Sequence, residues 1–170
     1  IPPGERIDRA ADRVEPAAAW WDRSPCRTPM PWTDEPGAGF TSGRPWLRLA
    51  DDTDRRNVRA QLAVPDSVLA CYRRLLAARA TSEALQVGRL EPVAEAHPDV
   101  VAYRRRAVSE TVVVVINLTS RRTAIAGAEL GATGWRPVVG THRDLPGIVL
   151  AGETLHLRPF EASVLAPHDD

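Results

Sequence analysis

The chain carries the sequence RSPCRTPMPW at residues 23–32, and the irregular stretch continues as far as PW at residues 45–46. Proline fixes φ and pushes the preceding residue toward extended conformations, so the three prolines of residues 23–32 exclude a helix or a central strand there. The stretch is therefore expected to be an ordered loop with little conformational freedom. Long loops without secondary structure are uncommon in compact domains, and those that occur are often functional.

The sequence on both sides of this loop has neither helical nor strand periodicity, from the start of the chain to about residue 54. It nevertheless contains four of the five tryptophans, at positions 20, 21, 32 and 46. Aromatic side chains need a surface to pack on, and an irregular region of this length argues against an independent domain. We therefore expect the first third of the chain to pack on another part of a larger structure.

The first regular element predicted is a helix over about residues 66–80. Val68, Tyr72, Leu75 and Leu76 fall on one helical face, and Pro65 precedes the helix. A shorter helical turn is expected over residues 57–62.

From residue 82 onward the pattern changes to short β-like runs separated by turns. The run VVVVI at residues 112–116 is continuous and β-branched, as expected for a strand buried on both faces. Residues 107–110 fit a hairpin turn before it. Several short strands at regular spacing indicate an antiparallel sandwich. The candidate strands are residues 85–90, 99–105, 111–118, 122–125, 135–139, 154–157 and 160–165.

Composition excludes several classes of function. The 170 residues carry 22 basic and 22 acidic side chains, so no charge excess points to nucleic acid or to an anionic membrane. No lysine is present, which excludes Schiff-base chemistry and a phosphate-loop lysine in this chain. No signal peptide or membrane span is visible, so we expect a cytoplasmic protein. The chain begins with Ile1 and not methionine, so we expect a processed chain or a piece of a longer one.

Motifs for metal or cofactor chemistry are missing from the sequence. None of the four histidines has a ligand partner at metal-binding spacing, and the two cysteines are not near them in the sequence. We expect no metal and no cofactor. Asp22, Asp34 and Glu35 flank the proline-rich loop, and a retaining glycosidase needs two carboxyl groups about 5 Å apart. Asp34 and Glu35 precede Pro36-Gly37, however, where acidic residues commonly serve the backbone of a turn.

The motifs resemble a known family. RTPMPW at residues 27–32, AGFT at 38–41 and PW at 45–46 are similar to the signature that follows the last barrel strand in α-glucosidases and oligo-1,6-glucosidases. These enzymes belong to the α-amylase superfamily, glycoside hydrolase family 13. Residues 65–75 look like that family's final barrel helix, while NLT at 117–119 and RPFEA at 158–162 look like its C-terminal β-domain. The likeness covers essentially the whole chain.

The resemblance implies an α+β fragment: the last loop and helix of a (β/α)8 barrel, within residues 1–81, followed by an antiparallel β-sandwich domain, residues 82–170. Its catalytic carboxylates lie on barrel strands that precede this segment, so the resemblance implies no catalytic residue here. Arg23 is similar in position to an arginine that helps hold the non-reducing-end glucose. A guanidinium suits that role because it donates paired hydrogen bonds to vicinal hydroxyls. Arg27 is expected to pack among its prolines.

The functional expectation is the C-terminal part of a retaining α-glucosidase acting on oligosaccharides or disaccharides. Its partners would be the α-glucoside substrate and the missing N-terminal barrel portion, with no nucleic acid and no membrane. Two alternatives stay open at this point. One is a related transglucosylase or isomerase of the trehalose synthase or sucrose isomerase type. The other is a non-catalytic β-sandwich that binds carbohydrate.

Overall fold

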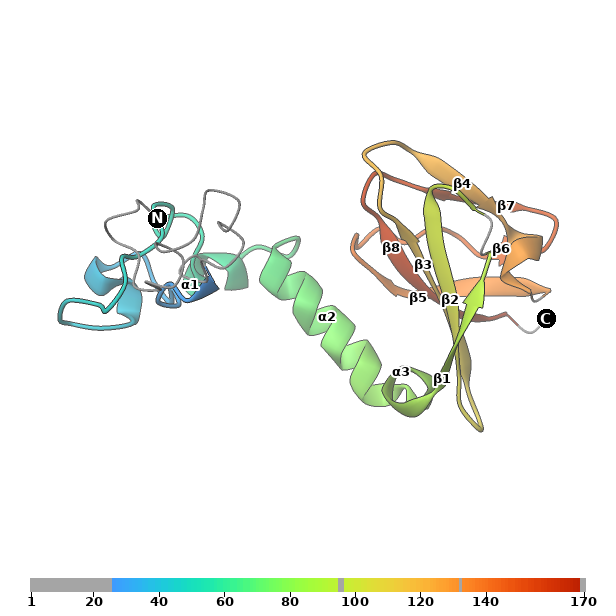
Figure 1. Ribbon diagram of the computed structural model, residues 1–170, viewed down its shortest axis with the longest axis horizontal. Helices are drawn as coiled ribbons and strands as arrows, with labels where there is room; N and C mark the ends of the chain where they lie inside the picture. The colour runs from blue at the N-terminus through green and yellow to red at the C-terminus, as the bar shows by residue number, and fades with distance from the viewer. Residues whose placement is uncertain (1–25, 95–96, 132, 169–170) are drawn as a thin grey trace, which may run out of the picture. The chain divides into compact units, whose positions relative to one another are not determined.

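A computed structural model describes residues 26–94, 97–131 and 133–168 (Figure 1). The chain divides into two compact units, residues 1–69 and 70–170. The sequence placed a domain boundary after residue 81, and that boundary stays a prediction.

The first unit is mostly irregular, as expected from its prolines. Within the described residues 26–67, its regular elements are a short 3-10 helix, η5 (Pro36–Gly39), and one helical turn, α1 (Val58–Leu62). The turn α1 confirms the helical turn predicted at residues 57–62. Asn57 caps α1, since its side-chain oxygen accepts a hydrogen bond from the Ala60 amide at 2.8 Å.

Two helices lead into the second unit. The helix α2 (Val68–Thr81) confirms the predicted helix, and α3 (Glu83–Val87) follows it directly. The strand predicted at residues 85–90 is therefore wrong over its first part. Ser82 explains the difference, because its hydroxyl accepts a hydrogen bond from the Leu85 amide at 3.1 Å and starts a new helical turn. Gly88 ends that turn, and a Cβ there would lie 2.5 Å from the Ala84 carbonyl oxygen.

In the described residues of the second unit, eight strands form two antiparallel sheets. The large sheet has the order β1-β2-β3-β8-β5-β6, and the small sheet pairs β4 with β7 (Figure 1). Every strand pairing is antiparallel. The strands are β1 (Arg89–Val93), β2 (Val100–Arg106), β3 (Thr111–Asn117), β4 (Thr123–Ala126), β5 (Gly134–Gly140), β6 (Val149–Leu150), β7 (Thr154–Leu157) and β8 (Ala162–Pro167); a 3-10 helix, η6 (Gly127–Leu130), follows β4.

The strand β3 is buried on both faces, as the run VVVVI predicts. Val113 and Val115 belong to the main core, which also contains Trp135 and residues of both sheets. Val112 and Val114 point to the opposite face and pack with α2 and α3. We call this second side, covered in part by the two helices, the outer face of the large sheet.

The structure confirms the antiparallel β-fold expected for this region. The strands predicted from residue 99 onward all appear, each within two residues of the expected limits. The Ala107 amide donates to the Glu110 carbonyl oxygen at 2.8 Å and closes the predicted turn between β2 and β3. In the part of the chain that the structure describes, no helix has the length and apolarity needed to cross a membrane.

Candidate functional site

The candidate site is the proline-rich loop, of which the structure describes residues 26–48; we call this part the PW loop. The residue predicted to bind substrate, Arg23, lies outside the described residues. Asp22 and the tryptophans at 20 and 21 lie outside them as well. Arg27 is described and is exposed, so the expectation that it packs among the prolines is wrong.

The PW loop folds around the peptide group of Ala38. The Ala38 carbonyl oxygen accepts hydrogen bonds from the amides of Trp32 at 2.8 Å and Thr33 at 3.1 Å, and the Ala38 amide donates to the Glu35 carbonyl oxygen at 2.7 Å. The Ala38 side chain is 1% exposed, although its φ of +54° lies in the left-handed region. A strained non-glycine residue persists only where its surroundings determine its conformation, so this part of the loop is held firmly.

Hydrogen bonds from the helical turn α1 also hold the PW loop in place. The amides of Val58 and Arg59 donate to the carbonyl oxygens of Pro31 and Trp32, each at 3.0 Å. These amides belong to the first turn of α1 and have no partner within the helix. Asn57 is 2% exposed, and its side-chain amide also donates to the Thr53 carbonyl oxygen at 2.9 Å. Residues 53–60 therefore set the position of the loop that follows Arg23.

The carboxylates of the PW loop form ion pairs. Arg59 pairs with Asp34, and also with Glu35 at 3.1 Å. The side-chain hydrogen bond from Arg59 is the main cause that holds the pKa of Asp34 below its ordinary value. A general acid needs the opposite shift, because it must carry its proton near neutral pH. The contacts therefore favour the structural role of these residues that the turn sequence indicates.

Large apolar side chains project from the PW loop. Trp32 is 49% exposed and Trp46 is 53% exposed, and Met30 and Phe40 are similarly exposed. In a loop with a fixed backbone, exposed aromatic faces offer apolar area for packing or for stacking on a sugar ring.

The structure describes no metal centre. Among the described residues, no three histidine, cysteine or acidic side chains gather closely enough to hold a metal ion. His97 instead forms hydrogen bonds with the backbone. Its Nδ1 accepts hydrogen bonds from the amides of Asp99 at 3.2 Å and Val100 at 3.1 Å. Its Nε2 therefore carries the proton and donates to the Ala124 carbonyl oxygen at 2.9 Å.

The motif NLT at residues 117–119 is part of a buried polar network. The Asn117 side chain is fully buried, and its amide donates to the carbonyl oxygens of Arg121 at 2.7 Å and Arg158 at 2.8 Å. Its oxygen accepts from the amide and the hydroxyl of Thr119, at 2.9 and 2.8 Å. One side chain thus joins the turn after β3 to the turn before β8.

The motif RPFEA at residues 158–162 supplies an ion pair beside Asn117. The Arg158 guanidinium donates to both carboxylate oxygens of Glu161, at 3.0 and 3.2 Å, and also to Asp144 at 2.8 Å. The Arg158 amide donates to the same carboxylate at 2.7 Å. Glu161 is only 3% exposed. Burial would raise the pKa of Glu161, but the hydrogen bonds from Arg158 outweigh burial and hold it below its ordinary value.

This ion pair predicts acid sensitivity of the second unit. A carboxyl group whose pKa is lowered by folding stabilises the protein above its unfolded-state pKa, and that stabilisation is lost as the pH falls through the folded-state value. We expect the free energy of unfolding to fall below about pH 4. Glu161→Gln should be less stable at pH 7 and should lose part of this pH dependence. Urea unfolding at pH 7 and at pH 3 measures both effects.

The matched control for this prediction is Glu153→Gln, at an exposed glutamate of the same unit. It should leave the pH dependence unchanged. An equal pH dependence in Glu161→Gln and in the unmodified chain would contradict the assignment to Glu161.

Two residues that hold the PW loop and α3 in position, Arg59 and Glu110, were not identified from the sequence. Arg59 pairs with both carboxylates of the PW loop across more than twenty residues of sequence, and no local pattern indicates this. Glu110 accepts hydrogen bonds from the Ser82 hydroxyl and the Ala84 amide, both at 2.8 Å, and ties α3 to the hairpin of β2 and β3. The serine that starts α3 was a usable signal, since serine is a preferred N-terminal cap.

Comparison with known proteins identifies the family. Residues 5–88 match the family described as alpha amylase, catalytic domain. The chain is 32% identical over 154 residues to the trehalose-6-phosphate hydrolase of Escherichia coli (strain K12), a match that spans 91% of this chain and 27% of that protein. It is 30% identical over 142 residues to the oligo-1,6-glucosidase of Heyndrickxia coagulans, which spans 84% of this chain and 24% of that enzyme.

Solved structures give the same family. The trehalulose synthase MutB from Pseudomonas mesoacidophila MX-45 matches with a TM-score of 0.75 and 27% identity, over 85% of this chain and 26% of that one. The isomaltulose synthase SmuA from Protaminobacter rubrum matches with a TM-score of 0.75 and 26% identity, over 87% of this chain and 26% of that one. The chain spans about a quarter of the length of the relatives it matches. The sequence motifs, the family match and these relatives agree: the chain belongs to the α-amylase family, glycoside hydrolase family 13.

Proposed function

We propose that this chain is the C-terminal part of a retaining α-glucosidase that cleaves α-glucosidic bonds of oligosaccharides or disaccharides. The observation that carries the proposal is the alignment of 91% of the chain with a relative named trehalose-6-phosphate hydrolase. Relatives named oligo-1,6-glucosidase and α-glucosidase support it. Residues 1–81 would supply the last barrel loop and the last barrel helix, and residues 82–170 a separate β-domain. A cytoplasmic location is part of the proposal.

Within this enzyme, Arg23 would bind the substrate. Active sites of (β/α)8 barrels lie on the loops at the C-terminal ends of the strands, and a loop that follows the last strand fits that rule. The PW loop begins three residues after Arg23 and is fixed by Ala38 and α1. Paired hydrogen bonds to a sugar require a guanidinium held in one orientation, and a fixed loop directly after Arg23 is compatible with that role.

The proposal predicts that the 170-residue chain is inactive on its own, since it contributes a binding arginine and no catalytic carboxylate. We expect no hydrolysis of p-nitrophenyl α-glucoside by the purified chain, and hydrolysis by the complete enzyme under the same conditions. The assay measures released p-nitrophenol. Turnover by the isolated chain, retained through purification from a host that lacks α-glucosidases, would overturn the assignment of catalysis to another segment.

One alternative has an observation in its favour. The solved structures described above are a trehalulose synthase and an isomaltulose synthase, and another structure of MutB was obtained with the substrate sucrose. A transglucosylase or isomerase is therefore the second candidate. Incubation of the complete enzyme with sucrose separates the two reactions. Equal release of glucose and fructose indicates hydrolysis, whereas a rearranged disaccharide indicates isomerisation.

A further inference from the structure

Arg59 joins α1 to the PW loop through both its backbone and its side chain. Its amide donates to the Trp32 carbonyl oxygen at 3.0 Å. Its guanidinium pairs with Asp34, and with Glu35 at 3.1 Å. The two carboxylates precede Arg59 by more than twenty residues, so these ion pairs join two segments that are distant in the sequence. We call the two ion pairs the Arg59 clamp.

The clamp holds the PW loop directly before a strained turn. Residues 37–39 follow one another with φ of +75°, +54° and +66°, all in the left-handed region. A Cβ on Gly39 would lie 3.0 Å from the Thr33 hydroxyl oxygen, so the two arms of the turn are closely packed. Such a conformation persists only where its surroundings fix it. Asp34 and Glu35 lie in the first arm of the turn, and the clamp ties this arm to α1.

The side chains of the clamp are exposed to solvent. Arg59 is 55% exposed, and Asp34 and Glu35 are 54% and 63% exposed. Exposed ion pairs contribute little to the free energy of unfolding, and salt screens them. The hydrogen bonds of the Ala38 peptide group and of the α1 amides hold the loop backbone as well. Loss of the clamp is therefore expected to shift the loop between nearby arrangements and not to unfold it.

A small shift of the PW loop matters because of what precedes the loop in the sequence. The loop begins three residues after Arg23, the proposed substrate-binding residue. A guanidinium forms paired hydrogen bonds with a sugar only when its plane is aligned with two hydroxyl groups. A displacement of about 1 Å at such a site can be costly. The position of the loop therefore affects how strongly Arg23 can bind.

We propose that Arg59 is a positioning residue of the substrate site: its clamp holds the PW loop, and through the loop Arg23, in the arrangement that binds the sugar. Arg59 itself does not contact the substrate. Because the clamp is electrostatic and exposed, the binding of an uncharged sugar becomes sensitive to salt. This inference rests on the proposed function.

The first test compares the complete enzyme with its Arg59→Gln variant on p-nitrophenyl α-glucoside. At low salt the variant should have a KM about threefold higher and an unchanged kcat, because the bound sugar selects the molecules whose loop is in place. Arg59→Lys should lie between the two, since an ammonium group lacks the planar fork that can pair with both carboxylates.

Salt gives a signature that a purely structural role would not produce. Raising the salt concentration from about 0.01 M to about 1 M shortens the screening length from about 30 Å to about 3 Å. Over this range the KM of the unmodified enzyme should rise about twofold, while the KM of Arg59→Gln should stay constant. The substrate carries no charge, so long-range attraction to the enzyme does not contribute to the effect.

A double variant shows whether Arg59 acts through Arg23. In an enzyme that already carries Arg23→Ala, the addition of Arg59→Gln should leave KM unchanged, because the side chain that the clamp positions is gone. Two residues that act independently would instead have effects that add.

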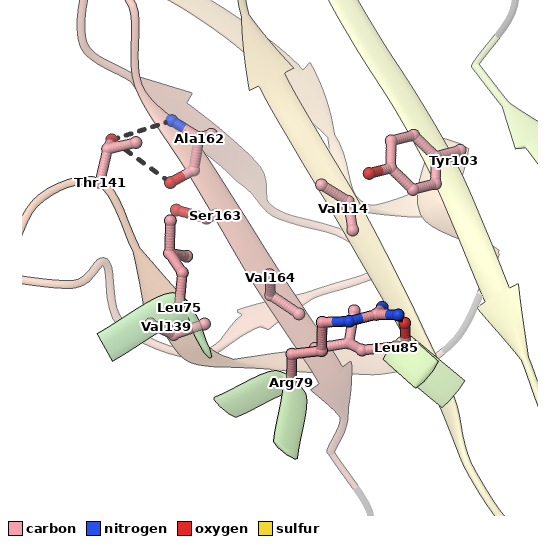
Figure 2. A pocket seen from close by; sticks show the side chains of 10 residues that line it. All are labelled: Leu75, Arg79, Leu85, Tyr103, Val114, Val139, Thr141, Ala162, Ser163 and Val164. Atoms are coloured by element: carbon pink, nitrogen blue, oxygen red, sulfur yellow. Dashed lines mark hydrogen bonds between the residues drawn. The ribbon is translucent and has the colours of Figure 1, made fainter. Parts of the chain in front are cut away.

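Two controls separate positioning from stability. Arg56→Gln removes an exposed ion pair of the same segment, with Asp52 at 3.1 Å, and should leave KM and its salt dependence unchanged. Val164→Ala truncates a buried side chain on the outer face of the large sheet, where Val164 lies beside Val114 (Figure 2). It should lower the midpoint of thermal unfolding by about 4 °C or more and leave KM unchanged.

A measurement without catalysis tests the clamp itself. The amides of Trp32 and Thr33 donate to the Ala38 carbonyl oxygen, so their hydrogen exchange in the 170-residue chain reports how firmly the loop is held. Arg59→Gln should speed this exchange about threefold, whereas Arg56→Gln should not change it.

Three results would overturn the proposal. The first is a KM and a salt dependence of Arg59→Gln equal to those of the unmodified enzyme. The second is an equal effect of Arg59→Gln with and without Arg23. The third is unchanged exchange at Trp32 and Thr33. A complete enzyme that does not hydrolyse the glucoside would contradict the proposed function instead, and faster exchange in Arg59→Gln would then still show that the clamp holds the loop.

Discussion

Replacing Arg23 by alanine in the complete enzyme is expected to lower kcat/KM toward p-nitrophenyl α-glucoside by about 10²-fold or more, with folding intact. A hydrogen bond to a charged group contributes about 1.5–3 kcal/mol, and Arg23 is proposed to donate two of them to vicinal hydroxyls of the glucose. Steady-state kinetics and a thermal unfolding curve for each variant measure the two parts of this expectation.

Two further variants make the Arg23 result specific. Arg23→Lys keeps the charge but loses the planar fork, so it should recover part of the lost kcat/KM and remain well below the unmodified enzyme. Arg55→Ala removes another arginine of the same unit, whose side chain is 81% exposed, and should leave the kinetics unchanged. If Arg23→Ala retained full kcat/KM, Arg23 would have no place in the substrate site.

Replacing Asn117 by alanine is expected to destabilise the second unit by about 3–5 kcal/mol, a large fraction of the stability of a typical domain. The side chain is fully buried and makes four hydrogen bonds. Its removal leaves the carbonyl oxygens of Arg121 and Arg158 without that donor, and buried groups that lose a partner keep their full cost of desolvation. Urea unfolding of the isolated chain, followed by circular dichroism, gives this value.

The neighbours of Asn117 provide graded controls. Thr119→Val removes one of the four hydrogen bonds and should cost about 1 kcal/mol. Leu118→Ala changes a side chain that is 66% exposed, and its effect should stay within about 0.5 kcal/mol. A loss in Asn117→Ala no larger than that in Leu118→Ala would show that the two turns are held together by other contacts.

Periodicity in the sequence predicted most of the regular structure. The apolar face of residues 68–76 located α2, and the β-branched run at 112–116 located a strand buried on both faces. The same approach failed at residues 85–87, because a serine cap and a hydrogen bond to a distant glutamate decide that helical turn. It also missed β6, which has only two residues and no pattern of its own.

The candidate site was predicted less completely, for a physical reason. The motif around residues 27–32 indicated the family and Arg23, and the prolines indicated a fixed loop. The hydrogen bonds that fix the loop join Ala38 to Trp32 and Pro31 to Val58. These contacts join residues that are distant in the sequence. Secondary-structure propensity and hydrophobic periodicity describe only local sequence, so they do not predict such contacts.

The position of β8 has a consequence for how the second unit is made. Among the strands that the structure describes, β8 comes last in the sequence, yet it lies between β3 and β5 in the middle of the large sheet. During synthesis, the hairpin of β2 and β3 can form early, but the two halves of the sheet stay separate until residues 162–167 have left the ribosome. Until then β3 and β5 expose unpaired edges, which favour association with other chains. A chain that stops before residue 162 would therefore lack β8 and be an aggregation-prone product, not a slightly shortened domain.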